Sequence, residues 1–359
     1  MRKLNFSSGP ATLPEPVLRA AQDAIWDLDG SGIGLLEHSH RGKEFGRVLD
    51  GAEAAVREVG GIGEDFAVMF VTAGATHHFA MVPRNFLGPD DTVDVCHTGV
   101  WSQKVIDEAQ RVGHVHVASS GAPEFAAVPT QFAWSAAPRY VHYTSNETIY
   151  GTEWAVPPPA PAPLVCDASS DIFSRPLALA NHGLIYAGAQ KNLGPSGISL
   201  VIGDKKFVAT GATALAPLDQ YRTYVKDRSL HNTPNTFGIW MIGEVCRWIL
   251  AHGGLAAMAE RNAHKAKLLY DCLDGSTQWR AHARPGSRSN MNVTFRGPSA
   301  AAEDALIAEA EARGMSGLRG HRSVGGMRAS IYNAFPEEGV ARLVALLREL
   351  DGPRGAHDA

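Results

Sequence analysis

Two charged residues, Asp167 and Lys191, each follow a short apolar run that is typical of a buried strand. An Asp at such a position can hold a protonated ring nitrogen through a charge-assisted hydrogen bond. A lysine in a partly desolvated site can lose its proton and form a Schiff base. Taken singly, Asp167 is better explained as a helix N-cap, because two serines follow it, and Lys191 as an ordinary surface lysine. Taken together, they would lie at adjacent strand ends around one ring, which indicates pyridoxal-phosphate chemistry.

A turn of small residues, 72–76, joins an apolar strand to a helical pattern that begins at His77. Small residues let backbone N–H groups approach a phosphate, and a helix N-terminus favours an anion. Many strand-to-helix turns have this composition, so the motif alone is weak. Trp101 opens another helical pattern and could stack on a flat heteroaromatic ring, although a core aromatic explains it equally well.

Three arginines could bind an anionic substrate through bidentate hydrogen bonds. Arg41 lies in the run 38–42, and Arg322 and Arg328 lie in the Gly-rich run 320–328. Gly-rich segments of this kind are as often solvated turns. None of the 15 histidines belongs to a cluster with metal-ligand spacing, so we expect no metal site. No G-x-S-x-G elbow is present, which argues against a hydrolase.

The elements that must position these groups alternate along the first 250 residues. Near-continuous apolar runs at 66–71, 140–143, 163–167, 184–188 and 198–202 predict an α/β fold whose mostly parallel sheet is covered on both faces. After residue 253, helical patterns at 255–273, 300–313 and 339–350 flank strand-like runs at 291–295 and 327–332, which indicates a smaller α+β domain. We therefore expect a large domain at 16–255 and a small domain formed by 1–15 and 256–359. Residues 157–163 would be a stiff connector and 353–359 a frayed tail.

Composition and charge bear on which partners and which cell compartment the protein is expected to have. The formal net charge is -4, from 33 basic and 37 acidic residues, which gives no sign of a nucleic-acid or membrane partner. The N-terminus has no apolar h-region, and no apolar stretch reaches the ~20 residues of a membrane span. The four cysteines are widely spaced, which fits a reducing cytoplasm.

Segments along nearly the whole chain resemble the phosphoserine aminotransferases, which are fold-type I, class V pyridoxal-phosphate enzymes. The run at 187–192 reads Ala-Gly-Ala-Gln-Lys-Asn, and the other matching segments are 5–10, 39–45, 146–149, 167–170, 174–176, 232–234 and 321–334. One departure concerns the phosphate turn, which in the family is usually Gly-rich and followed by Gly-Gln. Here residues 73–78 read Ala-Gly-Ala-Thr-His-His, so His77 and His78 could alter that pocket.

The resemblance implies a role for each matching position. Toward pyridoxal 5'-phosphate, Lys191 would form the Schiff base and move protons, Asp167 would hold the ring nitrogen, and Trp101 would stack on the ring. The remaining cofactor contacts would come from Thr148 on the ring hydroxyl, from Ala75, Thr76 and Gln190 on the phosphate, and from the partner subunit's Asn232 and Thr233. The substrate contacts would be Arg328 on the α-carboxylate, His40, Arg41, His321 and Arg322 around the distal anion, and Ser8 in a segment that closes over the pocket.

The implied activity moves the amino group of glutamate to 3-phosphohydroxypyruvate, giving 2-oxoglutarate and phosphoserine by a ping-pong mechanism in a homodimer with shared sites. The resemblance implies a place in serine biosynthesis and also associates the enzyme with pyridoxine biosynthesis. Three alternatives stay open: a relative retuned for another ω-anionic keto or amino acid, a scaffold without activity, and a lyase or desulfurase of the same class. A lyase or desulfurase would need a cysteine in a mobile active-site loop, and none of the four lies in an obvious one.

Overall fold

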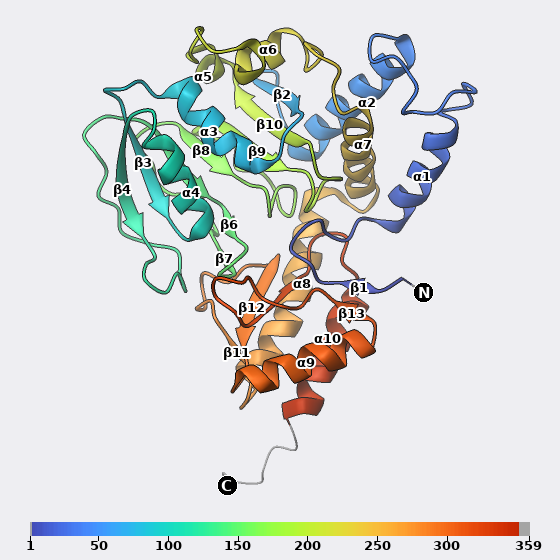
Figure 1. Ribbon diagram of the computed structural model, residues 1–359, viewed down its shortest axis with the longest axis vertical. Coiled ribbons are helices and arrows are strands. Elements are labelled where there is room, and N and C mark those ends of the chain that lie inside the picture. The colour runs from blue at the N-terminus through green and yellow to red at the C-terminus, as the bar shows by residue number, and fades with distance from the viewer. Residues whose placement is uncertain (1, 352–359) are drawn as a thin grey trace.

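The computed structural model describes residues 2–351 and is built around a seven-stranded sheet (Figure 1). The strand order is β2-β10-β9-β8-β5-β3-β4, and only β10 runs antiparallel to its neighbours. The strands are β2 (Phe66–Val71), β3 (Thr92–His97), β4 (His114–Ser120), β5 (Pro138–Thr144), β8 (Leu164–Asp167), β9 (His182–Gly188) and β10 (Ser199–Asp204). The predicted mostly parallel α/β sheet is thus confirmed.

Alternate side chains of these strands enter two different hydrophobic clusters, because a strand presents successive residues to opposite faces. Along β2, Val68 and Phe70 join one cluster, whereas Met69 joins the other. The first face is covered by α1 (Glu15–Trp26), α2 (Lys43–Gly60) and α7 (Thr236–Ala251). The second is covered by α3 (Ala75–Phe86), α4 (Val100–Ala109), α5 (Lys205–Ala209) and α6 (Tyr221–Lys226).

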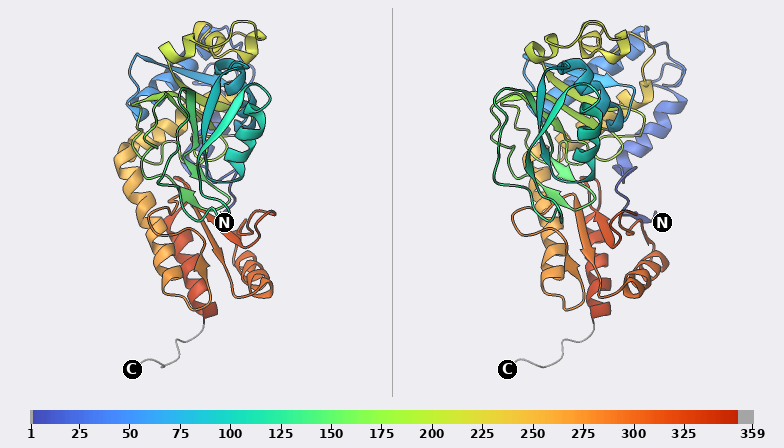
Figure 2. Two further views of the ribbon diagram at one scale, coloured as in Figure 1. Left: turned by 90° about the vertical axis from the view of Figure 1, so that its left-hand side faces the viewer. Right: turned by 60° about the vertical axis from the view of Figure 1, so that its left-hand side comes forward.

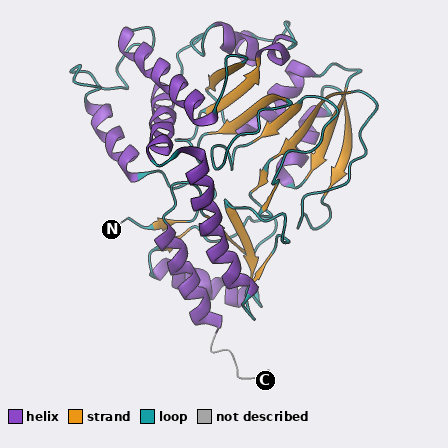
Figure 3. Cartoon of the chain, turned by 180° about the vertical axis from the view of Figure 1, so that it is seen from behind, coloured by secondary structure: helices purple, strands orange, loops and turns teal. Residues whose placement is uncertain are grey.

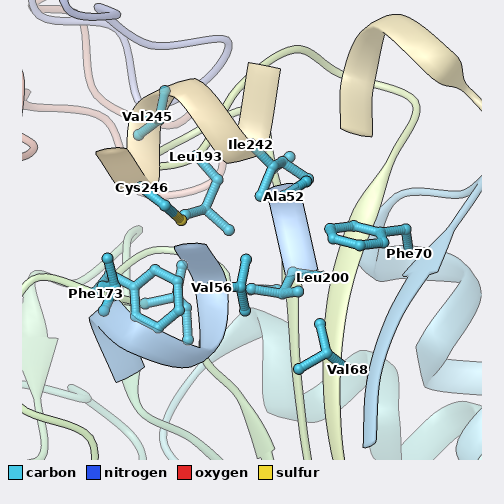
Figure 4. Close-up of a cluster of buried hydrophobic side chains, with 14 of the residues drawn as sticks. Ala52, Val56, Val68, Phe70, Phe173, Leu193, Leu200, Ile242, Val245 and Cys246 are labelled. Carbon is cyan, nitrogen blue, oxygen red and sulfur yellow. The ribbon is translucent and has the colours of Figure 1, made fainter. Parts of the chain in front are cut away.

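Figure 4 shows how the first face is filled. Val56 of α2 points toward Leu200 of the sheet, and Ile242 of α7 lies close to Ala52 of α2. Helices α2 and α7 pack against each other closely because small residues meet there: a Cβ on Gly243 would lie 3.0 Å from Ala52. Burying such aliphatic side chains contributes about 1.5–3 kcal/mol each relative to exposure. This packing holds the helices on the sheet in which strand β8 ends at Asp167.

A second, smaller layer lies below the sheet in Figure 1 and contains the C-terminal elements. Its three-stranded sheet has the order β11-β12-β14, and β1 of the N-terminal segment pairs with β13. A separate hairpin, β6 (Asn146–Glu147) and β7 (Thr152–Glu153), lies near it. The other elements are α8 (Gly254–Asp274), α9 (Ala300–Ala312), α10 (Glu337–Asp351), β1 (Leu4–Asn5), β11 (Arg280–Ala281), β12 (Asn292–Arg296), β13 (Met315–Ser316) and β14 (Met327–Ser330).

Helix α8 runs continuously from the large layer into the small one, as Figures 2 and 3 show from other sides. Its first turns place Leu255 and Met258 in the core of the large layer, and its later turns place Ala266 and Leu269 in the core of the small layer. A domain boundary at 255/256 stays a prediction. The predicted tail at 353–359 lies outside the described residues. Within residues 2–351, no helix combines the length and the apolar character that crossing a membrane requires.

Candidate active site

Asp167 and Lys191 meet where two neighbouring strands end. Strands β8 and β9 pair in parallel, Asp167 is the last residue of β8, and Lys191 follows β9 by three residues. Asp167 is only 5% exposed, and its Oδ1 accepts hydrogen bonds from the backbone N–H (3.0 Å) and the hydroxyl (2.6 Å) of Ser169. Asp167 therefore does bond to a following serine, as the N-cap explanation expects, but the residues after Asp167 form turns and not a helix. Within residues 2–351, Oδ2 has no hydrogen-bond partner and is available to a ligand.

Asp167 and Lys191 each shift the pKa of the other. Burial raises the pKa of Asp167, and the nearby Lys191 and the Ser169 hydrogen bonds oppose that shift. Burial lowers the pKa of Lys191, and Arg328 acts in the same direction, whereas Asp167 and Glu147 oppose it. A lysine whose ammonium form is destabilised in this way supplies a neutral amine more readily than a surface lysine.

Trp101 lies beside Lys191, and a hydrogen bond to Thr148, the residue after β6, holds its indole ring. Its ring centroid is 5.7 Å from Nζ of Lys191, and its indole N–H donates to Oγ1 of Thr148 at 2.9 Å. Arg328 binds the same hairpin from β14, because its NH1 donates to the carbonyl of Thr148 at 3.2 Å. The other terminal nitrogen of Arg328 donates to Oγ of Ser8 at 2.7 Å. The N-terminal segment, the hairpin and β14 thus converge around one space.

The predicted phosphate cradle, the turn at 72–76, leads into the N-terminus of α3, which lies next to Gly188 of β9. A Cβ added at Gly188 would lie 2.8 Å from Oε1 of Gln190 and 3.4 Å from the backbone nitrogen of Ala75. Oε1 of Gln190 is buried and has no partner in the described part of the chain, and Thr76 is exposed in the first turn of α3. Free N–H groups at a helix N-terminus bind anions, so the backbone N–H groups of Ala75 and Thr76 would suit a phosphate. The structure starts α3 at Ala75, two residues before the predicted start.

His77 and His78 do not point into this cradle together. His78 is 0% exposed, and its ring nitrogens bond to the hydroxyls of Tyr221 (2.8 Å) and Ser199 (2.6 Å). Burial lowers its pKa to about 3, so the ring is neutral. His77 is 43% exposed and faces Asp219 at 3.7 Å. The substitution of Gly-Gln by His-His therefore changes the packing behind the turn.

A group of basic side chains surrounds His321, and one of them, Lys104, lies over the Trp101 ring. Burial lowers the pKa of His321, and the charges of Arg328, Arg322 and Lys104 lower it further, so these groups are neighbours. Lys104 Nζ is 4.8 Å from the Trp101 ring centroid. Four cationic or titratable side chains in one place attract an anion, and within residues 2–351 no carboxylate forms an ion pair with any of them.

Four predicted site residues lie away from Lys191 in the single chain. His40 and Arg41 lie in the loop before α2, and Nε2 of His40 is buried without a partner. Asn232 and Thr233 are exposed just before α7. Among the described residues, no hydrogen bond or ion pair connects these four to the site.

Sequence reasoning missed two residues that the site contains. Glu147 lies in a matching segment but was given no role, although a carboxylate between the strand at 140–143 and Ile149 is an unusual composition for a buried stretch. Lys104 follows Trp101 by three positions in a helix, a spacing that puts both on one face and could have identified it.

This fold and site define an α/β enzyme of the pyridoxal-phosphate type, with the acid and the lysine at adjacent strand ends. The sequence model of the aminotransferase class-V family matches residues 3–343, and the chain belongs to that family. Proteins named phosphoserine aminotransferase are 46% identical in Herpetosiphon aurantiacus (99% of this chain, 100% of that protein) and 45% identical in Nitrosomonas europaea (98% and 99%).

Solved structures agree with these matches and confirm the predicted fold class. The phosphoserine aminotransferase from Bacillus circulans subsp. alkalophilus superposes with a TM-score of 0.95 at 42% identity, covering 98% of each chain. A PLP-bound phosphoserine aminotransferase from Trichomonas vaginalis gives a TM-score of 0.92 at 36% identity, covering 97% of this chain and 100% of that one.

Proposed function

We propose that this protein is a phosphoserine aminotransferase that carries pyridoxal 5'-phosphate on Lys191. It moves the amino group of glutamate to 3-phosphohydroxypyruvate, with 2-oxoglutarate and phosphoserine as products. The observation that carries the proposal is the pairing of Asp167 and Lys191 at adjacent strand ends beside Trp101. The names of relatives that cover nearly the whole chain support the same activity.

The residues present fit this cofactor. Among the described residues Oδ2 of Asp167 has no partner, so it suits a protonated pyridine nitrogen, and the indole of Trp101 offers a flat face. Gly188 lies close to the backbone nitrogen of Ala75, so the absence of a side chain there keeps the N-terminus of α3 accessible to a phosphate. When bound, the cofactor supplies an electron sink for the carbanion at the substrate α-carbon.

The chain's own residues bind substrate and move the proton. Nζ of Lys191 would take the proton from the substrate α-carbon, which its lowered pKa favours because the neutral amine is the base. Nε of Arg328 is buried and has no partner within residues 2–351, and the guanidinium suits the α-carboxylate. His321 and Arg322 would bind the distal anion, and Ser8 would hold Arg328 in place. Two substrates using one site in turn give ping-pong kinetics.

The assembly we propose is a homodimer that shares its active sites. Large apolar side chains cluster on α1 and the following loop, and Trp26 is 86% exposed there. Exposed apolar patches mark protein–protein contacts, and the same loop leads to His40 and Arg41. The cluster consists of Ile25, Trp26, Ile33 and Leu36. His40, Arg41, Asn232 and Thr233 would complete the partner's site. Four buried free thiols suit the reducing cytoplasm, where we place the enzyme.

Absorbance of the purified protein tests the cofactor assignment. We expect a band at about 410 nm in the wild type, a general property of lysine-bound pyridoxal phosphate, and none in K191A. K104A, which keeps Lys191, should retain the band. A band that persists in K191A would refute the role of Lys191.

Amino-acceptor specificity tests the substrate assignment. We expect 3-phosphohydroxypyruvate to give a kcat/KM at least about tenfold above that of pyruvate, because only the former carries a distal anion. Equal values would instead favour a relative that acts on another ω-anionic or a neutral keto acid. A desulfurase is disfavoured because burial raises the pKa of all four buried cysteines.

A further inference from the structure

Arg296 is the last residue of β12, and it bonds to the Gly-rich loop that carries His321 and Arg322. This loop, residues 320–326, lies between β13 and β14. NH1 of Arg296 donates to the carbonyl of Val324 at 2.9 Å. The proposed reaction has given Arg296 no part, although the loop that it contacts presents two of the residues proposed to bind the distal anion.

The contact with Val324 reaches His321 through two backbone hydrogen bonds. The N–H of Val324 donates to the carbonyl of His321 at 3.0 Å, and the N–H of Gly325 donates to the same carbonyl at 2.8 Å. Arg296 therefore holds a peptide group that lies in the same small turn as His321.

Arg296 and the loop also fit together closely. Gly325 and Gly326 both have left-handed backbones, with φ of 68° and 69°. A Cβ on Gly326 would lie 2.5 Å from Cδ of Arg296 and 3.0 Å from the carbonyl oxygen of Phe295. Glycine at this position is therefore what lets the loop approach the aliphatic stem of Arg296.

Packing beneath the loop is incomplete. A pocket of about 150 Å³ is lined by Val324 and Gly325 of the loop and, among others, by Tyr150 of the hairpin. Atoms beside such a space lack van der Waals partners on that side. Within residues 2–351, no side-chain hydrogen bond other than that of Arg296 joins residues 320–326 to the rest of the chain. The position of the loop therefore depends strongly on Arg296.

Arg296 is itself held by α9. Its Nε donates to Oε1 of Glu303 at 2.8 Å, and the same oxygen accepts the backbone N–H of Gly297 at 3.0 Å. The side chain of Glu303 is only 9% exposed, so the carboxylate is a well-fixed partner. One guanidinium thus bonds to α9 through one nitrogen and to the loop through another.

We propose that Arg296 is a positioning residue for the distal anion: it holds the loop against α9, so that His321 and Arg322 are in place before a phosphorylated substrate arrives. The inference rests on the proposed function, because it takes these two residues as ligands of the substrate phosphate. Arg296 does not touch the substrate in this scheme. Without Arg296, binding must also order the loop, which weakens substrate binding and leaves the chemistry at Lys191 unchanged.

Steady-state kinetics of the holoenzyme test this role. R296M keeps an aliphatic stem and removes both hydrogen bonds. We expect the KM for 3-phosphohydroxypyruvate to rise about tenfold, as the loss of one charged hydrogen bond allows, with kcat within about twofold of the wild type. A KM within about twofold of the wild type would overturn the proposal, whatever happens to kcat.

Matched variants separate the contact with the loop from the contact with α9. Arg319 also pairs with a carboxylate of α9, since its NH2 lies 2.9 Å from Oδ1 of Asp304, but within residues 2–351 its side chain makes no hydrogen bond to the loop. R319M should therefore keep the wild-type KM, and R296K, which retains a cationic donor, should raise KM less than R296M. If the unpaired Glu303 prevents R296M from folding, R296M/E303Q removes that charge as well, and the same rise is expected. A rise as large in R319M as in R296M would overturn the proposal.

Hydrogen exchange distinguishes this proposal from the proposed function. The amide hydrogens of Val324 and Gly325 should exchange at least about fivefold faster in R296M than in the wild type, whereas those of α9 should not change. Unchanged exchange in the loop would overturn the role of Arg296 whatever the substrate is. A wild-type enzyme that does not favour 3-phosphohydroxypyruvate over pyruvate would instead contradict the proposed function, and the exchange rates would still decide whether Arg296 holds the loop.

Discussion

His78 offers a direct test of how the unusual residues behind the phosphate turn are used. H78F keeps an aromatic ring in the stack with Tyr186, whose centroid lies 5.1 Å away, but removes both hydrogen bonds. The hydroxyl of Tyr221 then has no partner in residues 2–351, whereas Ser199 keeps a weak bond to the carbonyl of Val71 at 3.4 Å. The unpaired Tyr221 hydroxyl costs about 1–3 kcal/mol, and the lost bond to Ser199 costs about 0.5–1.5 kcal/mol more, so H78F should lose about 2–4 kcal/mol of unfolding free energy at pH 7.5.

The same structure predicts that this loss shrinks in acid. The pKa of His78 is about 3 in the folded protein, whereas the ordinary value for an exposed histidine is 6.5. Because the folded pKa is depressed, the contribution of the neutral ring is complete above pH 6.5 and declines as the pH falls from 6.5 toward 3. At pH 5.5 the unfolded chain gains a proton that the folded protein rejects, which costs the wild type about 1.4 kcal/mol. H78F has no such cost, so the gap between the two proteins narrows by about 1.4 kcal/mol.

Urea unfolding of the apoenzymes, followed by tryptophan fluorescence at pH 7.5 and pH 5.5, measures both quantities. H77Q is the matched control, because His77 is exposed, and its stability should equal that of the wild type at each pH. The reasoning fails if the gap between H78F and the wild type is the same at both pH values. It also fails if H77Q is as unstable as H78F.

Three further predictions follow from single contacts. R328K loses one of the two proposed hydrogen bonds to the α-carboxylate, which is worth about 1.5–3 kcal/mol. We therefore expect kcat/KM to fall about 10- to 150-fold for glutamate and for phosphoserine alike. A fall for only one of these amino donors would contradict the role of Arg328. G188A places a methyl group beside the phosphate cradle, 2.8 Å from Oε1 of Gln190. We expect the Kd for pyridoxal phosphate to rise at least about tenfold in a fluorescence titration. An unchanged Kd would contradict the cradle. K265M leaves the carbonyls of residues 331, 332 and 335 without their buried ammonium donor. Calorimetry should show a lower Tm and an unfolding free energy that is smaller by about 3 kcal/mol or more. An unchanged Tm would contradict the structural role of Lys265.

The central pair could be predicted from the sequence because it depends on local rules. Apolar runs of about four to seven residues mark buried strands, and ligands in open α/β sheets bind at the carboxyl ends of those strands. Asp167 and Lys191 each follow such a run, and β8 and β9 are indeed neighbours. Strands β3 and β4 were not predicted because His and Asp interrupt their apolar residues.

Residues whose role depends on what surrounds them could not be predicted in this way. His78 is neutral because the sheet and α6 exclude water from it, and nothing in the letters His-His distinguishes it from the exposed His77. Lys265 is a similar case: it lies on α8, yet its ammonium is buried against carbonyls that lie 66 to 70 positions later in the chain. Glu147 needs Gly99 and α4 to bury it. Such contacts are set by tertiary packing, which no local pattern records.

The distal part of the site is best understood as a balance of charge. Lys104, which lies over the Trp101 ring, acts on His321 together with Arg322 and Arg328; burial lowers the pKa of His321, and these three charges lower it further. No carboxylate in residues 2–351 pairs with them, so an arriving anion meets unneutralised positive charge and raises the proton affinity of His321. A histidine that gains a proton as the anion binds can match either one or two negative charges. This property suits a pocket that must accept a carboxylate from glutamate and a phosphate from phosphoserine in alternate half-reactions.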